Sequence, residues 1–211
     1  MKLLKRAYLK TSLLVLVLSS CSSYKPSNIT TEGLVDQRIK NGHFDLVDSS
    51  YLYRVRIQIY NENLNGIFVV KKINEDAHRV VLTSDFGNTL YDCTVSAKKF
   101  KVHSAVPQLN KWMVKRILQR DFRLLVHSDV QAYQKLTTDA HDIYVNKSKR
   151  RKNYYSYKAG TNELEQIASA NNRKVKLAID YYKASNPIQD SIVIQHYAIP
   201  LKMVLAPLQQ D

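Results

Sequence analysis

The sequence predicts a mainly β fold, in which a strongly curved antiparallel sheet of about ten or eleven strands is covered at one end by one or two helices. Three observations predict it. Residues 51–60 (YLYRVRIQIY) alternate strictly, which is the period of a half-buried strand. Short patterns of this kind recur along the chain, separated by residues typical of turns. Residues 107–125 instead show helical spacing.

Residues 1–20 precede the predicted domain and have the features of a bacterial signal peptide. Four basic residues lie among the first ten, the apolar run LLVLVL follows, and Leu18-Ser19-Ser20-Cys21 completes a lipobox. The apolar run is far shorter than the roughly 20 residues of a membrane-spanning helix. A buried N-terminal helix, or a plain signal peptide with a chance cysteine, is the alternative.

Cys21 is therefore the predicted lipidation site, carrying a diacylglycerol and an amide-linked acyl chain after signal cleavage. Each buried methylene contributes roughly 0.8 kcal/mol, so two or more chains anchor a protein firmly. Ser22 is not the aspartate that retains many lipoproteins in the inner membrane, so we expect anchoring at the periplasmic face of the outer membrane. Residues 21–44 are predicted to form the lipidated tether, and 45–211 a single domain.

The charge of the chain favours an anionic partner. Without the four basic residues of the signal, 28 basic residues face 18 acidic ones, a net charge of +10. In an envelope lipoprotein we expect acidic lipid or lipopolysaccharide as that partner, no nucleic acid, and a monomer. With Cys21 lipidated, Cys93 is left without a partner and is predicted to be a buried strand thiol.

The first half of the domain has the pattern of an antiparallel meander. Turn-rich connections are predicted at residues 61–66 and 74–77. The predicted strands lie at residues 51–60, 67–73, 79–83 and 90–95.

A phenylalanine occupies the tip of the last predicted hairpin. Asp85 and Gly87-Asn88 are turn residues on either side of Phe86. Burying a phenylalanine side chain is worth roughly 1.5 to 3 kcal/mol, so an exposed one suggests that a membrane or a partner covers it. Alternatively, Phe86 folds back over the end of the sheet.

One helix packed on the sheet is predicted at residues 107–125, where a proline suits the helix start. Leu118 and Phe122 lie off its apolar stripe, and a basic amphipathic helix lying on the membrane is the alternative. The stripe itself consists of Leu109, Trp112, Met113 and Ile117.

Strand patterns return after a second, weaker segment at residues 129–136. Pro200 separates the last two strands and suits a bulge or an edge. The strands predicted in this half lie at residues 142–146, 154–158, 164–168, 174–182, 191–199 and 201–205.

A basic cluster, KSKRRK, occupies residues 147–152. Each basic residue near an acidic membrane contributes about 1 kcal/mol, so its cations are candidate contacts for anionic headgroups. A solvated hairpin loop is the alternative. The candidate residues are Lys147, Lys149, Arg150, Arg151 and Lys152.

No pattern of catalytic or metal-binding residues stands out. Asp139-Ala140-His141-Asp142 is the only cluster of histidine with carboxylates, and it offers too few ligands for zinc. A glycine-rich phosphate loop, a nucleophile elbow and an HExxH motif are all missing from the sequence. We expect no enzyme, no cofactor and no metal; an envelope enzyme using histidine and aspartate is a weaker rival.

In order and pattern, these segments resemble the LolA/LolB-like lipoprotein-carrier superfamily, and most closely its outer-membrane lipoprotein branch, LolB. The resemblance covers most of residues 45–208. It rests on the lipobox, the alternating strand 51–60, HRVVLTSDFGNTLYDC at 78–93, RDFRLL at 120–125 and YAIPLKMVL at 197–205.

The resemblance implies an unclosed antiparallel β-barrel around a hydrophobic cavity, with one or two helices as its lid. It implies binding of the acyl chains of lipoprotein or lipid cargo, received from a soluble LolA-like carrier. Phe86 would be the apolar loop residue that inserts into the membrane, although Asp85-Phe86 replaces the family's typical proline-leucine pair. The predicted cavity-lining residues are Tyr53, Val55, Ile57, Phe68, Val70, Val81, Val175, Leu177 and Ile179.

The sequence leaves open whether this interior is hollow. Barrels of this size are filled by side chains or hold one ligand. A filled interior would favour a structural or accessory envelope lipoprotein that binds a protein partner.

Overall fold

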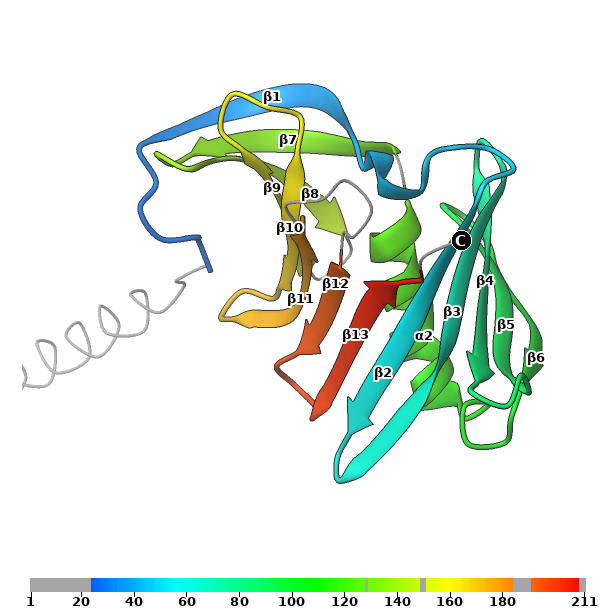
Figure 1. Cartoon of the computed structure of the whole chain (residues 1–211). Coiled ribbons are helices and arrows are strands. Elements are labelled where there is room, and N and C mark those ends of the chain that lie inside the picture. The colour runs from blue at the N-terminus through cyan, green and yellow to red at the C-terminus, as the bar shows by residue number, and fades with distance from the viewer. Residues whose placement is uncertain (1–23, 128, 149–150, 184–190, 209–211) are drawn as a thin grey trace, which may run out of the picture.

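The computed structural model describes residues 24–127, 129–148, 151–183 and 191–208, which form one antiparallel sheet of 13 strands (Figure 1). The strand order is β1-β7-β8-β9-β10-β11-β12-β13-β2-β3-β4-β5-β6. Because β1 and β6 do not pair with each other, the barrel is unclosed, which confirms the predicted fold class.

The strands before the helix are β1 (Thr31–Lys40), β2 (Ser50–Ile59), β3 (Glu62–Asn74), β4 (Ala77–Ser84), β5 (Thr89–Ser96) and β6 (Phe100–Ala105). The strands after it are β7 (Asp129–Thr137), β8 (His141–Ser148), β9 (Arg151–Lys158), β10 (Leu164–Ala170), β11 (Val175–Tyr182), β12 (Ser191–His196) and β13 (Leu201–Pro207).

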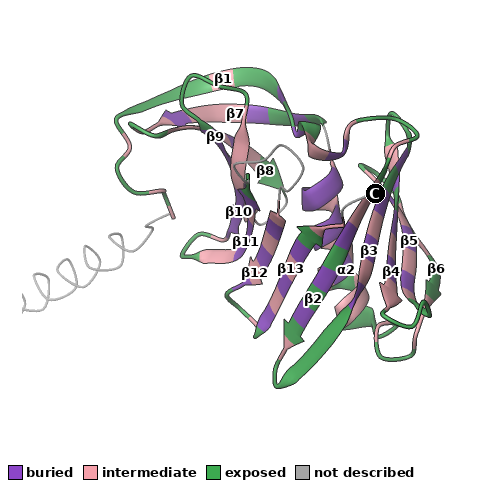
Figure 2. Cartoon of the chain, viewed as in Figure 1, coloured by how far each residue is buried: buried purple, intermediate pink, exposed green. Residues whose placement is uncertain are grey.

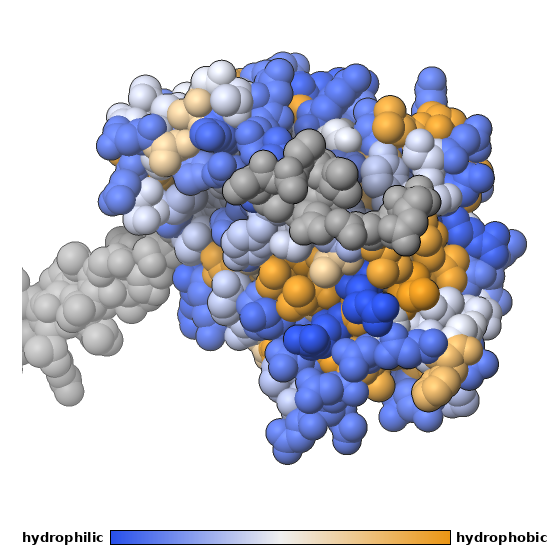
Figure 3. Space-filling model, in the orientation of Figure 1, coloured by the Kyte–Doolittle hydropathy of each residue, from blue (hydrophilic) through white to orange (hydrophobic). Residues whose placement is uncertain are grey.

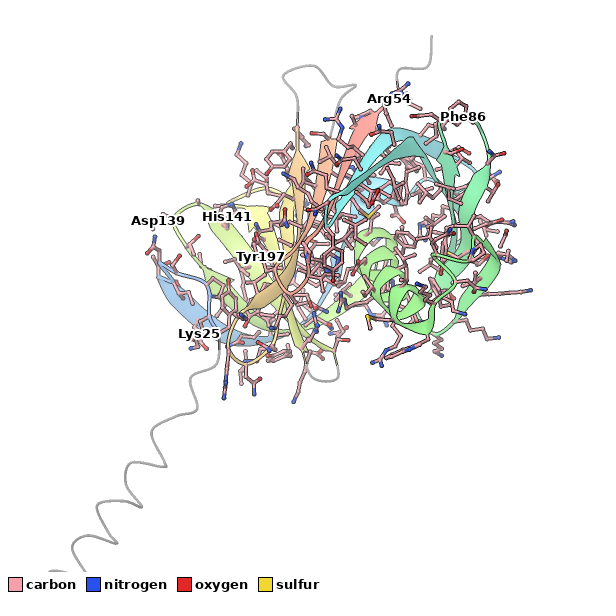
Figure 4. The ribbon with its side chains drawn as sticks, turned by 90° about the horizontal axis from the view of Figure 1, so that it is seen from below. Lys25, Arg54, Phe86, Asp139, His141 and Tyr197 are labelled. Atoms are coloured by element: carbon pink, nitrogen blue, oxygen red, sulfur yellow. The ribbon has the colours of Figure 1, made fainter. Side chains whose placement is uncertain are left out.

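The sheet curves around one α-helix, α2 (Trp112–Val126), which lies on its concave side (Figure 4). A short 3-10 helix, η1 (Gly42–Phe44), joins β1 to β2. Buried and exposed residues alternate along β2 and β13, as period-two patterns require (Figure 2). Within the described residues, no helix has the length and hydrophobicity needed to cross a membrane.

The helix differs from its prediction in both its start and its buried face. It begins at Trp112, after a turn, and its buried apolar residues include Leu118, Phe122 and Leu125. Trp112 and Met113, which belong to the predicted stripe, are exposed. Leu109 and Ile117 of the predicted stripe pack against the apolar core, so the stripe is right at two of its four residues. It missed Leu118 and Phe122, which are buried beside them.

Four segments of strand were not predicted. Residues 31–40, assigned to the tether, form β1 against β7, and residues 100–105 form β6. Residues 129–137 are strand as well. The predicted connection at 61–66 is mostly strand, because the chain reverses at Tyr60, whose φ of 52° is left-handed. β1, β6 and β7 add to the ten strand ranges predicted from the sequence, which explains why 13 strands replace the ten or eleven expected.

Candidate functional site

The concave face of the sheet and α2 enclose the main apolar cluster of the protein. The ring of Phe122 lies 5.6 Å from that of Phe68 and 6.3 Å from that of Tyr91, measured between centroids. Leu125 is fully buried beside them. Large side chains therefore occupy the space between α2 and these strands, and a ligand entering there has to separate the two surfaces.

Seven of the nine predicted cavity-lining residues lie in this cluster. They are Tyr53, Val55, Ile57, Phe68, Val70, Leu177 and Ile179.

Val81 and Val175 lie elsewhere. Val81 stands between Val80 and Leu82, both of which face the main cluster, so its own side chain is on the opposite face. Val175 packs against a second cluster on the outer face of β7–β10. In β11, Leu177 pairs with Ser169 and Val175 with the next residue of β10, so one extra residue inverts the alternation.

A buried polar group fixes α2 to the sheet. The Asp121 carboxylate lies 2.7 Å from Nε2 of His196 on β12, and neither side chain is more than 2% exposed. The Arg120 guanidinium donates to the other oxygen of Asp121 at 3.2 Å. The sequence analysis did not predict this group. The feature of the sequence that points to it is Asp121, an acidic residue among the apolar residues of RDFRLL.

Positive charge accumulates at this end of the interior. Arg151 on β9 has a buried Nη1 without a hydrogen-bond partner in the described part of the chain. Burial, together with the nearby charge of Arg120, lowers the pKa of Arg151. The interior is thus apolar along the sheet and cationic where β9 approaches α2.

Phe86 projects from the tip of the β4–β5 hairpin and is 93% exposed (Figure 4). The N–H of Gly87 donates to the Ser84 carbonyl at 2.9 Å, and the φ of 81° at Gly87 suits a residue without Cβ. The prediction of an apolar hairpin tip is confirmed. Phe86 does not fold back over the sheet.

Apolar side chains also gather on the convex face, over the strands at the front of Figure 3. Val193 and Val204 are register neighbours there, and both are half-buried. Arg54 of the neighbouring strand β2 lies 3.7 Å from Asp85, beside Phe86 in the hairpin. This pairing places cationic and apolar groups side by side on one surface.

The predicted basic cluster divides between several environments. Lys147 and Lys152 stand opposite each other in the β8–β9 pair, while Arg151 points toward α2. Lys149 and Arg150 lie outside the described residues, as does Cys21.

The other titratable candidates are structural. Cys93 is a free, fully buried strand thiol, as predicted, and burial raises its pKa to about 12. Among the described residues, no group of three or more histidine, cysteine, aspartate or glutamate side chains is arranged to hold a metal ion. His141 instead lies 2.8 Å from Glu165.

No family model and no curated protein matches this chain. Among solved structures, a DUF1329 family protein from Desulfovibrio piger ATCC 29098 is similar, with 12% identity, a TM-score of 0.43, and coverage of 79% of this chain and 86% of that one. A LolA superfamily protein from Nitrosomonas europaea is similar with 8% identity, a TM-score of 0.47, and coverage of 80% and 89%. At such values we draw no functional conclusion from either likeness.

Proposed function

We propose that this protein is a lipid-anchored, non-catalytic binding protein of the outer membrane that holds acyl chains between α2 and the concave face of its sheet. It would receive lipoprotein or lipid cargo from a soluble LolA-like carrier and assist its transfer into the outer membrane. The observation that carries this proposal is an extended apolar concave surface covered by α2 in an unclosed sheet.

The energetics require α2 to act as a lid. Exposing Leu118, Phe122 and Leu125 to water would cost roughly 1.5 to 3 kcal/mol for each side chain. An acyl chain that slides between helix and sheet keeps both surfaces in apolar contact, so most of this cost does not arise. The main polar contact to be given up is the Asp121–His196 pair.

We assign docking to the receiving membrane to Phe86 and to basic residues such as Arg54. Phe86 is the most exposed large apolar side chain among the described residues, and Arg54 lies beside its hairpin. Without residues 1–20 the net charge is +10, which favours an anionic surface. The acyl groups on Cys21 would keep the domain at that surface.

Tryptophan fluorescence tests the lid directly. Trp112 is the single tryptophan of the chain and the first residue of α2, and the guanidinium of Arg116 lies 5.7 Å from its ring centroid. Saturable binding of palmitate should shift its emission, and lipid should co-purify after mild extraction and be seen by mass spectrometry. A chain with neither bound lipid nor an emission shift would contradict acyl-chain binding.

The role of Phe86 needs a background without the acyl anchor. In a Cys21→Ala chain, Phe86→Glu should weaken sedimentation with phosphatidylglycerol vesicles several-fold, because a buried phenylalanine contributes roughly 1.5 to 3 kcal/mol. Leu34→Glu is the matched control, since Leu34 is also exposed but lies on the edge strand β1. Equal binding by both variants would remove Phe86 from the docking surface.

A second candidate is an accessory envelope lipoprotein that binds a protein partner. The packed concave face favours it, because the described core is already filled by side chains such as Phe68 and Phe122. On this reading α2 is a permanent part of the core, and palmitate leaves Trp112 emission unchanged.

A further inference from the structure

A groove lies on the outer face of strands β8–β11, on the side of the sheet away from α2. Its volume is about 760 Å3, within the range of roughly 300–1,000 Å3 typical of small-molecule sites. Ser156 and Ala168 form part of its floor, and the segment Tyr24–Asn28 forms one wall. The small floor residues leave the hollow that larger side chains fill on the other face.

The N-terminal wall is held by aromatic contacts. The ring of Tyr24 meets that of Tyr154 edge-on, with centroids 5.4 Å apart. The Tyr154 hydroxyl donates to the Tyr24 carbonyl at 2.8 Å. The groove is therefore built by packing and hydrogen bonding, and its aromatic lining is fixed in place.

The groove is acidic although the chain as a whole is strongly basic. Lys183 forms an ion pair with Glu163 at 3.1 Å, and His141 forms a hydrogen bond with Glu165. Asp139 and Asp180 have no cationic partner among the described residues; Asp180 accepts only from a neutral glutamine amide. Four carboxylates line the groove: Asp139, Glu163, Glu165 and Asp180.

A serine hydroxyl on the floor also lacks a partner within the described part of the chain. Ser156 is only 9% exposed, lines the groove, and forms no side-chain hydrogen bond within the described part of the chain. Its register neighbours are Ile143 and Gln166. The hydroxyl itself opens on the groove, where water or a ligand can form a hydrogen bond with it.

We infer that this groove binds a primary ammonium group carried on a small organic molecule. The carboxylates of Asp139 and Asp180 supply the compensating charge, the Ser156 hydroxyl accepts an N–H, and the tyrosine rings favour a cation at their faces. Unpaired carboxylates disfavour an anion. The polar floor disfavours a purely apolar chain.

The ammonium group can come from a free amine or from the ethanolamine headgroup of a phospholipid. Tyr24 follows Cys21 by three residues, which span at most about 11 Å when extended. Binding of a phospholipid headgroup therefore depends on the acyl anchor of the proposed function, because the anchor would hold the groove near the membrane. Binding of a free amine does not depend on it.

Titration of the full chain in detergent with spermidine tests the site, and O-phosphoethanolamine and phosphatidylethanolamine vesicles distinguish its sources. Asp139→Asn and Asp180→Asn should each weaken binding about fivefold, as the loss of one partly exposed charge pair does. Asp48→Asn, an exposed aspartate outside the groove, should leave binding unchanged. Binding of the vesicles alone, reduced by the groove variants, would assign the site to the headgroup.

A steric variant makes the test independent of charge. Ser156→Leu extends into the groove and should abolish spermidine binding, while Ser156→Ala should weaken it only slightly. If none of the three amines binds at millimolar concentration, or if the Asp139 and Asp180 variants bind like the wild type, the proposed ammonium site is wrong.

Discussion

The two faces of strand β9 differ in whether side chains fill the space beside them. Tyr155 and Tyr157 point to the concave side and belong to the main apolar cluster. Tyr154 and Ser156, which alternate with them, point to the outer face and line the groove. The inner face is closed by large rings and α2, whereas the outer face keeps a preformed hollow.

This difference separates two ways of binding. On the inner face, specificity would come from apolar surface, and access depends on moving α2. On the outer face, specificity comes from charge and from fixed walls, and no element has to move. Figure 4 places Asp139 and His141 of the groove on the flank of the molecule opposite to Phe86 and Arg54. Occupancy of the groove therefore need not obstruct docking through Phe86.

Removal of a large inner ring should have the largest effect on stability. Phe122→Ala should cost about 3–5 kcal/mol, because Phe122 is 1% exposed and packs between α2 and the sheet. At roughly 2–4 °C per kcal/mol, the melting temperature should fall by about 6 °C or more. Phe86→Ala makes the same chemical change at an exposed position and should melt like the wild type. Similar melting of both variants would show that α2 contributes little to the core.

Asp121→Asn should have the next largest effect. A hydrogen bond to a charged group contributes about 1.5–3 kcal/mol, and the buried His196 would lose its carboxylate partner. If α2 is a lid, this variant should also take up an apolar fluorescent probe more readily. Asp129→Asn removes an exposed pair with Arg38 and serves as the control. Lower stability without increased uptake would favour a permanent core helix.

Alternation predicted much of the sheet because it is a local property. Strand 51–60, and the seven predicted cavity-lining residues that lie in the main apolar cluster, follow directly from the alternation of apolar and polar residues. The same rule misplaced Val175, because a bulge that depends on the pairing of β10 with β11 inverts the face. A single strand carries no signal for such a bulge.

The buried face of α2 and the groove depend on tertiary contacts. Leu118 and Phe122 are buried because they meet the main apolar cluster in the folded chain, which the spacing of apolar residues alone does not show. The groove unites residues 24–28 with four strands far along the chain. Asp139 and His141 were visible as a cluster in the sequence, but Asp180 and Ser156 joined them only through register.

The inner face should also make stability depend on pH. Burial lowers the pKa of both His78 and His127 below the ordinary value of 6.5. Above that value both histidines are neutral in the folded and unfolded states. As the pH falls through 6.5 toward the lowered folded pKa values, the unfolded chain takes up protons that the folded chain does not, so stability declines.

The measurement is the melting temperature at about pH 7.5 and about pH 5, with His78→Gln as the comparison. The wild type should lose stability between these values, and His78→Gln should lose less. The carboxylate of Asp92, whose pKa is lowered by its hydrogen bond with Arg79, adds its own loss only in more acidic solution. A wild type that is equally stable at both values would contradict the role of buried histidines.

The smallest effect should come from two tyrosine hydroxyls on the same strand. Tyr157 donates to the Lys40 carbonyl and Tyr154 to the Tyr24 carbonyl, both at 2.8 Å. Tyr157→Phe should cost about 1 kcal/mol by urea denaturation, because the buried Tyr157 side chain loses its hydrogen bond. Tyr154→Phe should cost less, because water in the open groove can donate to the Tyr24 carbonyl instead. If Tyr154→Phe cost more stability than Tyr157→Phe, the outer wall would be enclosed and the groove would not be open to solvent.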